Sequence, residues 1–163
     1  MTQFMPVVEV AKIIRGILKE TFPETKFSVR LSRYSGGASV AVGWEDGPSD
    51  RRVDEKIGFL QGLDSDPMTD SSVPRGAFKW QGKLYSSGAN YVQCHRHYSK
   101  GLTEKMLARV KARYGLFASG VTVNEHGVIA SNPVADSEAF LFGGMYLSQL
   151  VWRELQSIEE TVA

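Results

Sequence analysis

The stretch at residues 26–46, KFSVRLSRYSGGASVAVGWED, decides the fold class. Apolar and polar residues alternate on both sides of its Ser-Gly-Gly turn at residues 35–37, and a period of two is typical of a strand with one buried face. Two such runs joined by a short glycine-containing turn predict a β-hairpin. The residues expected on its buried face are Phe27, Val29, Leu31, Val40, Val42 and Trp44.

Helical patterns surround this hairpin. Apolar residues recur every three to four positions between residues 6 and 21, and Pro23 ends that helix. We expect further helices over residues 50–63 and 102–114, the second capped by Ser99. A last helix is expected from Asp136 or Ser137 to about Glu159.

The remaining segments predict strands and one loop. Short strands are expected over residues 77–85, 89–99, 121–123 and 128–130, and residues 64–76 are expected to form a polar loop. Hairpins in place of regular βαβ crossovers predict an α+β fold, in which about four helices pack against an antiparallel sheet.

Length and composition indicate one globular domain. The chain has 163 residues, of which 42% are hydrophobic and 23% charged, and no linker divides it. We therefore expect a single α+β domain over residues 1–163. Its one cysteine, Cys94, excludes an intramolecular disulfide and suits a reducing compartment. The start lacks a signal-peptide pattern, and the apolar run at residues 139–152 is too short to span a bilayer, so we expect a cytoplasmic protein.

Charge is distributed unevenly along the chain. The net charge of +1 argues against a protein that coats nucleic acid by bulk electrostatics. Residues 94–113 nevertheless carry six basic residues and one acid, a net +5, between two segments of net −5 at residues 45–70 and 114–163. Lys105, Arg109 and Arg113 repeat every four residues and form a basic stripe on one helix. This stripe is either a solvated face or a contact for phosphates or an acidic protein surface.

The Cys-His-Arg-His motif at residues 94–97 is the densest polar cluster. On a strand, Cys94 and Arg96 point to one face and the two histidines to the other. The residues expected on the histidine face are Tyr91, Gln93, His95 and His97. Two histidines at this spacing can reach one metal ion, but nothing marks a third ligand, and adjacent strand residues diverge too far for a Cys/His nucleophile pair. The open alternatives are a polar strand face with a buried cysteine and a binding surface.

Arg30 lies on the polar face of the hairpin among small residues. Its expected neighbours there are Ser28, Ser32, Ser39, Ala41 and Gly43. Such a face is open enough to receive an extended ligand or a phosphate. If the strand at residues 89–99 pairs with the hairpin, His95 and His97 share this face with Arg30. The alternatives are a solvated sheet face and one covered by the C-terminal helix.

The expected C-terminal helix is apolar on almost every side. A helix of this kind lies either at the centre of the core or at a subunit interface, and Gly143-Gly144 permits close approach. The candidates for an interface between two copies of the chain are Phe140, Phe142, Met145, Tyr146 and Trp152.

Two quoted segments resemble a known family. AKIIRGILKETFPETKFSVRLSRYSGGASVAVGWEDGPSDRRV at residues 11–53 and YVQCHRHYS at residues 91–99 look like large polyvalent protein-associated domain 29, over about residues 6–100. Residues 101–163 form a helix–hairpin–helix extension outside it. The resemblance implies a protein of phages or conjugative elements, with a role in protecting incoming DNA or blocking host defence. It implies no catalytic residues.

The leading hypothesis is a non-enzymatic phage or mobile-element accessory protein that binds and inhibits a host defence component, as an anti-CRISPR protein does. Its partner is a host defence protein or its nucleic-acid complex, and no cofactor, metal or membrane is expected. The contact candidates are Arg30, Tyr91, His95, Arg96, His97, Lys105, Arg109 and Arg113. A nucleic-acid-binding module that protects or processes incoming DNA is the first alternative, and a metal-dependent nuclease or nucleotide hydrolase the second.

Overall fold

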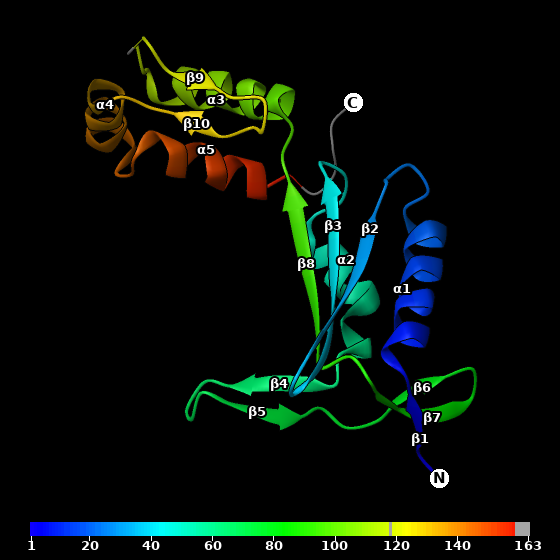
Figure 1. Ribbon diagram of the computed structural model, residues 1–163. Helices are drawn as coiled ribbons and strands as arrows, with labels where there is room; N and C mark the ends of the chain where they lie inside the picture. The colour runs from blue at the N-terminus through cyan, green and yellow to red at the C-terminus, as the bar shows by residue number, and fades with distance from the viewer. Residues whose placement is uncertain (118, 159–163) are drawn as a thin grey trace. The chain divides into compact units, whose positions relative to one another are not determined.

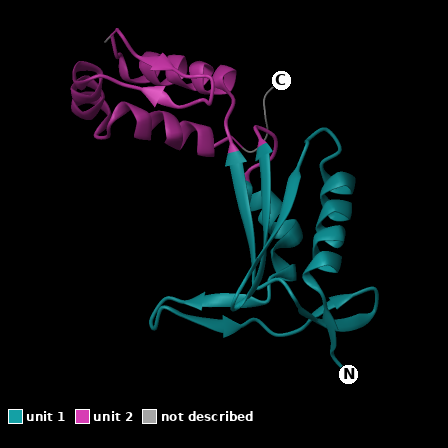
Figure 2. Ribbon diagram, viewed as in Figure 1, with its two compact units in different colours: residues 1–44, 50–96 teal, residues 45–49, 97–163 magenta. Residues whose placement is uncertain are grey.

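The computed structural model describes residues 1–117 and 119–158. It confirms the α+β class, with helices and several small sheets (Figure 1). The chain divides into two compact units (Figure 2). Unit 1 comprises Met1–Trp44 and Asp50–Arg96, and unit 2 comprises Glu45–Ser49 and the chain from His97 onward.

Unit 1 holds most of the strands. Its elements in chain order are β1 (Gln3–Met5), α1 (Val7–Thr21), β2 (Ser28–Tyr34), β3 (Gly37–Glu45), α2 (Asp50–Ile57), the 3₁₀ turn η1 (Gly58–Leu60), β4 (Leu63–Asp66), β5 (Ser71–Pro74), β6 (Phe78–Trp80), β7 (Lys83–Ser87) and β8 (Tyr91–His97). The first helix begins after Pro6 and ends before Pro23, as its periodicity predicts.

A three-stranded sheet in the order β2-β3-β8 forms the centre of unit 1. The predicted hairpin is confirmed: β2 pairs antiparallel with β3, and Val29 lies opposite Val42. Every second residue of β3 is buried against α1 and α2, which contribute buried apolar side chains to the same core. The largest of the fully buried side chains in this core are Val10, Ile14, Leu18, Val40, Val42, Val53, Ile57 and Leu60.

Two smaller sheets complete unit 1. β1 pairs parallel with β7, and β7 pairs antiparallel with β6. The expectation of a polar loop over residues 64–76 was wrong, because β4 and β5 form an antiparallel hairpin there. Asp66 closes its turn by accepting hydrogen bonds from the Met68 N–H and the Thr69 hydroxyl, and these bonds hold the pKa of its carboxyl below the ordinary value. Exposed, polar strands carry too few apolar residues to show a period of two.

Unit 2 is mostly helical. It contains α3 (Lys100–Tyr114), β9 (Thr122–Val123), β10 (Ile129–Ala130), α4 (Pro133–Gly143) and α5 (Leu147–Gln156). Ser99 caps α3 as predicted, since its hydroxyl accepts a hydrogen bond from the Leu102 N–H. β9 and β10 form the predicted hairpin. No helix within the described residues is long and apolar enough to cross a bilayer.

The expected single C-terminal helix is two helices. Asn132, rather than Asp136 or Ser137, caps α4 by accepting a hydrogen bond from the Ala135 N–H. Gly144 adopts φ 71° and ends α4, a left-handed conformation that glycine takes without a steric penalty. α5 ends at Gln156, and the expected endpoint, Glu159, lies outside the described residues.

The chain passes through unit 2 twice. Glu45–Ser49 belong to unit 2, although they lie between two segments of unit 1. The Asp46 N–H donates to the His97 carbonyl oxygen at 2.7 Å, and the Asp46 carboxylate accepts from the Ser99 N–H at 2.9 Å. These bonds join the short inserted segment to the start of the C-terminal part.

We expect Gly37→Ala to destabilise unit 1. A Cβ atom at this position would lie 2.2 Å from Asn90 Nδ2, so the Asn90 side chain would have to give up its hydrogen bond to the Gly36 carbonyl. The expected cost is about 1–2 kcal/mol in urea unfolding. Gly16→Ala is the matched control, because it lies inside α1 with open space around it and should stabilise by up to about 1 kcal/mol. Equal changes in the unfolding free energy of the two variants would contradict the view that Gly37 is required to make room for the Asn90 side chain.

Candidate functional site

The sheet β2-β3-β8 has one face covered by the core and one that carries polar and small side chains. Val29, Val42 and Val92 mark the covered face. The alternate residues form the opposite face, which we call the open sheet face. Within unit 1 it consists of Ser28, Arg30, Ser32 and Tyr34 from β2, Gly37, Ser39, Ala41 and Gly43 from β3, and Tyr91, Gln93 and His95 from β8.

Small residues run along the central strand of the open sheet face. Arg30 lies opposite Ala41, and Ser32 lies opposite Ser39. From Gly37 to Gly43 no β3 side chain on this face is larger than serine, and the exposed Glu45 follows at the end of the strand. The flanking strands carry Arg30 on one side and Tyr91 on the other. The Arg30 side chain is therefore exposed, and the backbone of β3 is accessible to an approaching ligand.

The third strand places its polar residues as predicted. β8 joins the sheet next to β3, so Tyr91 and His95 lie on the same face as Arg30. The Tyr91 hydroxyl lies 2.5 Å from the Ser72 hydroxyl, a hydrogen bond that ties β8 to the β4–β5 hairpin. The start of β8 is fixed by Asn90, whose N–H donates to the Ala38 carbonyl. His97 is exposed at the last position of β8, where unit 2 begins.

Arg96 and Cys94 lie on the other face of β8. Arg96 is buried, with 9% of its surface exposed, so its position does not fit the predicted role in a contact surface. Cys94 packs against the core. Burial, reinforced by the negative charges of Asp54 and Asp50, raises the pKa of its thiol to about 12. The thiol is therefore protonated at neutral pH and faces away from His95, an arrangement that does not suit nucleophilic chemistry.

The two strand histidines do not converge with further ligands. Within residues 1–117 and 119–158, no group of three His, Cys, Asp or Glu side chains is placed to hold a metal ion. His126, in the turn between β9 and β10, lies 3.7 Å from the carboxylate of its neighbour Glu125.

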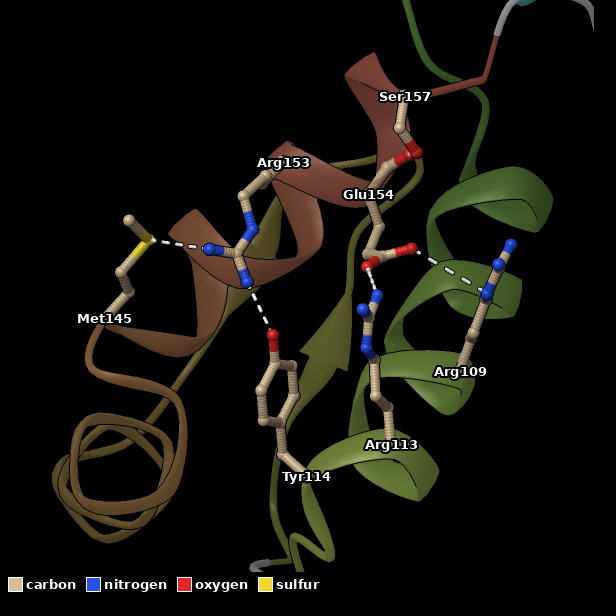
Figure 3. Close-up of polar contacts among 7 residues, drawn as sticks. All are labelled: Arg109, Arg113, Tyr114, Met145, Arg153, Glu154 and Ser157. Carbon is tan, nitrogen blue, oxygen red and sulfur yellow. Dashed lines mark hydrogen bonds and ion pairs between the residues drawn. The ribbon is translucent and has the colours of Figure 1, made fainter.

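The basic stripe of α3 is tied to α5 through one carboxylate (Figure 3). Glu154 is buried, with 8% of its side chain exposed. Its Oε1 lies 2.5 Å from Arg113 Nη1, and its Oε2 lies 3.7 Å from Arg109 Nε. The two arginines keep about 60% of their side chains exposed. Glu154 reduces the combined charge of the two arginines from +2 to +1. Lys105, the third member of the stripe, is exposed as well.

A second arginine contact joins the same two helices. Arg153 Nη2 donates to the Tyr114 hydroxyl at 2.5 Å, and its Nη1 lies 3.8 Å from the Met145 sulfur (Figure 3). The Arg113 guanidinium lies 5.8 Å from the centre of the Tyr114 ring. Sequence reasoning missed Glu154. Its signal was an acid at a position in α5 where the spacing of Leu147, Leu150 and Val151 predicts a buried residue.

The interface candidates near the C-terminus are exposed. The alternative that placed this apolar segment at the centre of the core was therefore wrong for its largest residues. α4 contributes only Ala135 and Ala139 to the buried residues of unit 2. The exposed residues are Phe140, Phe142, Met145, Tyr146 and Trp152, as well as Leu141.

Comparison with protein families decides where this chain belongs. The model of large polyvalent protein associated domain 29 matches residues 5–99. The chain is a member of that family. No curated protein and no solved structure matches it.

The domain 29 match coincides with the part of the chain that carries the open sheet face. It covers α1, the β2–β3 hairpin and β8, and it ends at Ser99, before α3 begins. The resemblance predicted from the sequence is confirmed. The basic stripe and the exposed residues of α4 lie outside the match.

We expect Cys94 to resist alkylation in the folded protein. With its pKa near 12, the thiolate fraction at pH 8 is small, and the core limits access of the reagent. Its reaction with iodoacetamide should be more than a hundredfold slower than in urea-unfolded protein. Mass spectrometry of samples quenched over time provides the rates, and comparable rates in the folded and unfolded states would contradict the burial.

We expect Arg113→Ala to destabilise unit 2 more than Lys105→Ala. Loss of Arg113 leaves the buried Glu154 carboxylate with the more distant Arg109 only, at an expected cost of about 1–3 kcal/mol. Lys105→Ala removes an exposed charge from the same helix and should change stability by less than about 0.5 kcal/mol. Thermal unfolding of both variants compares them, and equal shifts would mean that the Glu154 contact contributes nothing.

Proposed function

We propose that this domain 29 protein acts by binding a host defence component through its open sheet face, and thereby inhibits it. The observation that carries this proposal is an exposed arginine beside a row of small side chains, within the segment that defines the family. The context of such polyvalent-protein domains, in phages and other mobile elements, supports a target in host defence such as a CRISPR effector.

The shape of the open sheet face suits a protein partner. Gly37, Ser39, Ala41 and Gly43 let a loop or extended segment approach the backbone of β3 closely. Arg30 supplies a planar set of donors that can bind a carboxylate of the partner in two-pronged fashion. Tyr91 offers a ring that is held in place by Ser72, and fixed aromatic residues lose little entropy when they bind.

A binding role fits the chemistry of the face better than catalysis. Cys94 is protonated and lies on the opposite face from His95. Nucleophilic and general-base catalysis require a nucleophile or base within hydrogen-bond reach of a second group that orients it. The residues of the open sheet face contribute one arginine, one histidine, two tyrosines, glutamine and small side chains, which is a set suited to contact.

Nucleic acid is the competing partner, and the geometry favours it less. Arg109 and Arg113 direct their guanidinium groups to Glu154, so the basic stripe has less charge available to phosphates than its sequence suggests. A protein that neutralises several phosphates also loses affinity steeply as salt rises. This dependence separates the two classes of partner in one experiment.

The test combines a challenge assay with capture of the partner. Cells with an active defence system and expressing the wild-type protein should plate a targeted phage at least tenfold more efficiently than cells without it. Arg30→Glu should remove most of that gain, because the reversed charge repels an acidic contact. Tagged protein recovered from the same cells should retain the defence component after nuclease treatment and at elevated salt.

Lys19→Glu is the matched control. It makes the same change of charge on the exposed side of α1, away from the open sheet face, and should leave both protection and capture intact. The proposal fails if Arg30→Glu protects as well as the wild type. It also fails if nuclease treatment releases everything that the protein captures, an outcome that would assign the face to nucleic acid.

A further inference from the structure

Unit 2 carries a large exposed apolar surface that the proposed function does not use. It centres on α4 and the turn that follows, where the Phe140 and Tyr146 rings lie 6.0 Å apart. Near the start of α4, Phe117 and Val134 line an open pocket with Pro133. We call this the α4 surface. Its members are Phe117, Val134, Phe140, Leu141, Phe142, Met145 and Tyr146.

The arrangement of large and small residues on α4 is inverted. A helix on the edge of a core normally buries its large apolar residues and exposes polar ones. α4 instead packs on the core through Ala135, Ala139 and Gly143, which lie four residues apart on one side. A Cβ atom on Gly143 would come within 2.7 Å of Leu150 Cδ1, so this side of the helix has no room for a larger residue.

The hydrophobic core of unit 2 is complete without Phe140, Leu141 and Phe142. It is already formed by α3 and α5, with Leu102, Met106, Val110, Leu147, Leu150, Val151 and Leu155 among its buried residues. Phe140, Leu141 and Phe142 then project from the remaining sides of α4. Leaving such side chains in water forgoes roughly 1.5–3 kcal/mol each compared with burying them. A second surface that covers them recovers this free energy.

The size of the α4 surface matches one half of a stable interface. The exposed fractions of its residues run from 39% at Met145 to 89% at Phe117. With roughly 150–250 Å² for an aromatic side chain and less for Val134, Leu141 and Met145, the seven residues together expose about 800 Å², summed over the sides of α4 on which they lie. Each partner in a standard interface buries about 800 Å², whereas the largest apolar patch of a typical monomer covers about 300–600 Å².

We propose that a second copy of this chain covers the α4 surface, in a two-fold symmetric homodimer. The seven residues are uncharged, and Glu138, which lies beside them on α4, accepts a hydrogen bond from the Phe117 N–H, so the surface can face itself with little repulsion between like charges, as two-fold symmetry requires. The projecting Phe140, Leu141 and Phe142 side chains of each α4 pack against the α4 surface of the other copy.

Analytical ultracentrifugation across low to high micromolar concentrations tests this inference. The wild-type protein should sediment as a species of twice the 18.0 kDa chain mass. Leu141→Lys should raise the dissociation constant at least tenfold, because Leu141 is 79% exposed in one chain and becomes a buried charge in the dimer. Since the changed side chain is exposed in the single chain, circular dichroism and the unfolding midpoint at low concentration should stay as in the wild type.

Leu84→Lys is the control, since it makes the same change at an exposed leucine of β7 in unit 1 and should leave the dimer intact. The inference is overturned if the wild type sediments at the mass of one chain throughout, or if Leu141→Lys dimerises as tightly as the wild type. Capture of a different protein, or of lipid vesicles, by a monomeric wild type that Leu141→Lys abolishes would assign the surface to that partner instead.

Discussion

The burial of β3 on one face only is the constraint on which unit 1 depends. Val40, Val42 and Trp44 lock the strand against α1 and α2, and this fixes the direction of every residue between them. A slip of one residue would move the buried set into solvent. The burial of the valines therefore also fixes the small residues at positions 39, 41 and 43 on the uncovered face. Arg30 of β2 and the polar residues of β8 lie on that face because their strands pair with β3.

The sequence could predict this register because a period of two survives in any strand with one buried face. The three-to-four-residue period of an amphipathic helix likewise predicted α1 and α3, and the serine before α3 predicted its cap. Prediction from periodicity failed where apolar and polar residues do not alternate along the segment. β4 and β5 carry mostly polar residues, so their segment resembles a loop. α4 and α5 resemble one helix in sequence because apolar residues continue on both sides of Gly143-Gly144, and an apolar pattern does not report the left-handed φ of Gly144.

The candidate site residues also fall into two groups, those whose position follows from local sequence and those whose position depends on tertiary packing. Arg30, Tyr91 and His95 share a face because strand alternation and pairing place them there, which could be argued from spacing. Alternation also puts Arg96 on the face of Cys94. The contacts of Arg109 and Arg113 could not be predicted in this way, since they depend on residues distant in the chain. Glu154 lies 41 residues after Arg113, and only the packing of α3 against α5 brings the two together. A charge that looked available for a partner is thus partly a component of the helix packing.

The short segment Glu45–Ser49 gives the chain an interleaved topology. The polypeptide leaves unit 1 after β3, makes its contacts with His97 and Ser99, returns to form α2, and leaves again after β8. Breaking the chain at one point does not separate the two units. A truncation before His97 removes His97 and Ser99, the hydrogen-bond partners of Asp46, which lies in the connection between β3 and α2. The segment that connects β3 to α2 therefore takes these hydrogen bonds from residues at the end of β8 and just after it, more than 50 positions later in the chain.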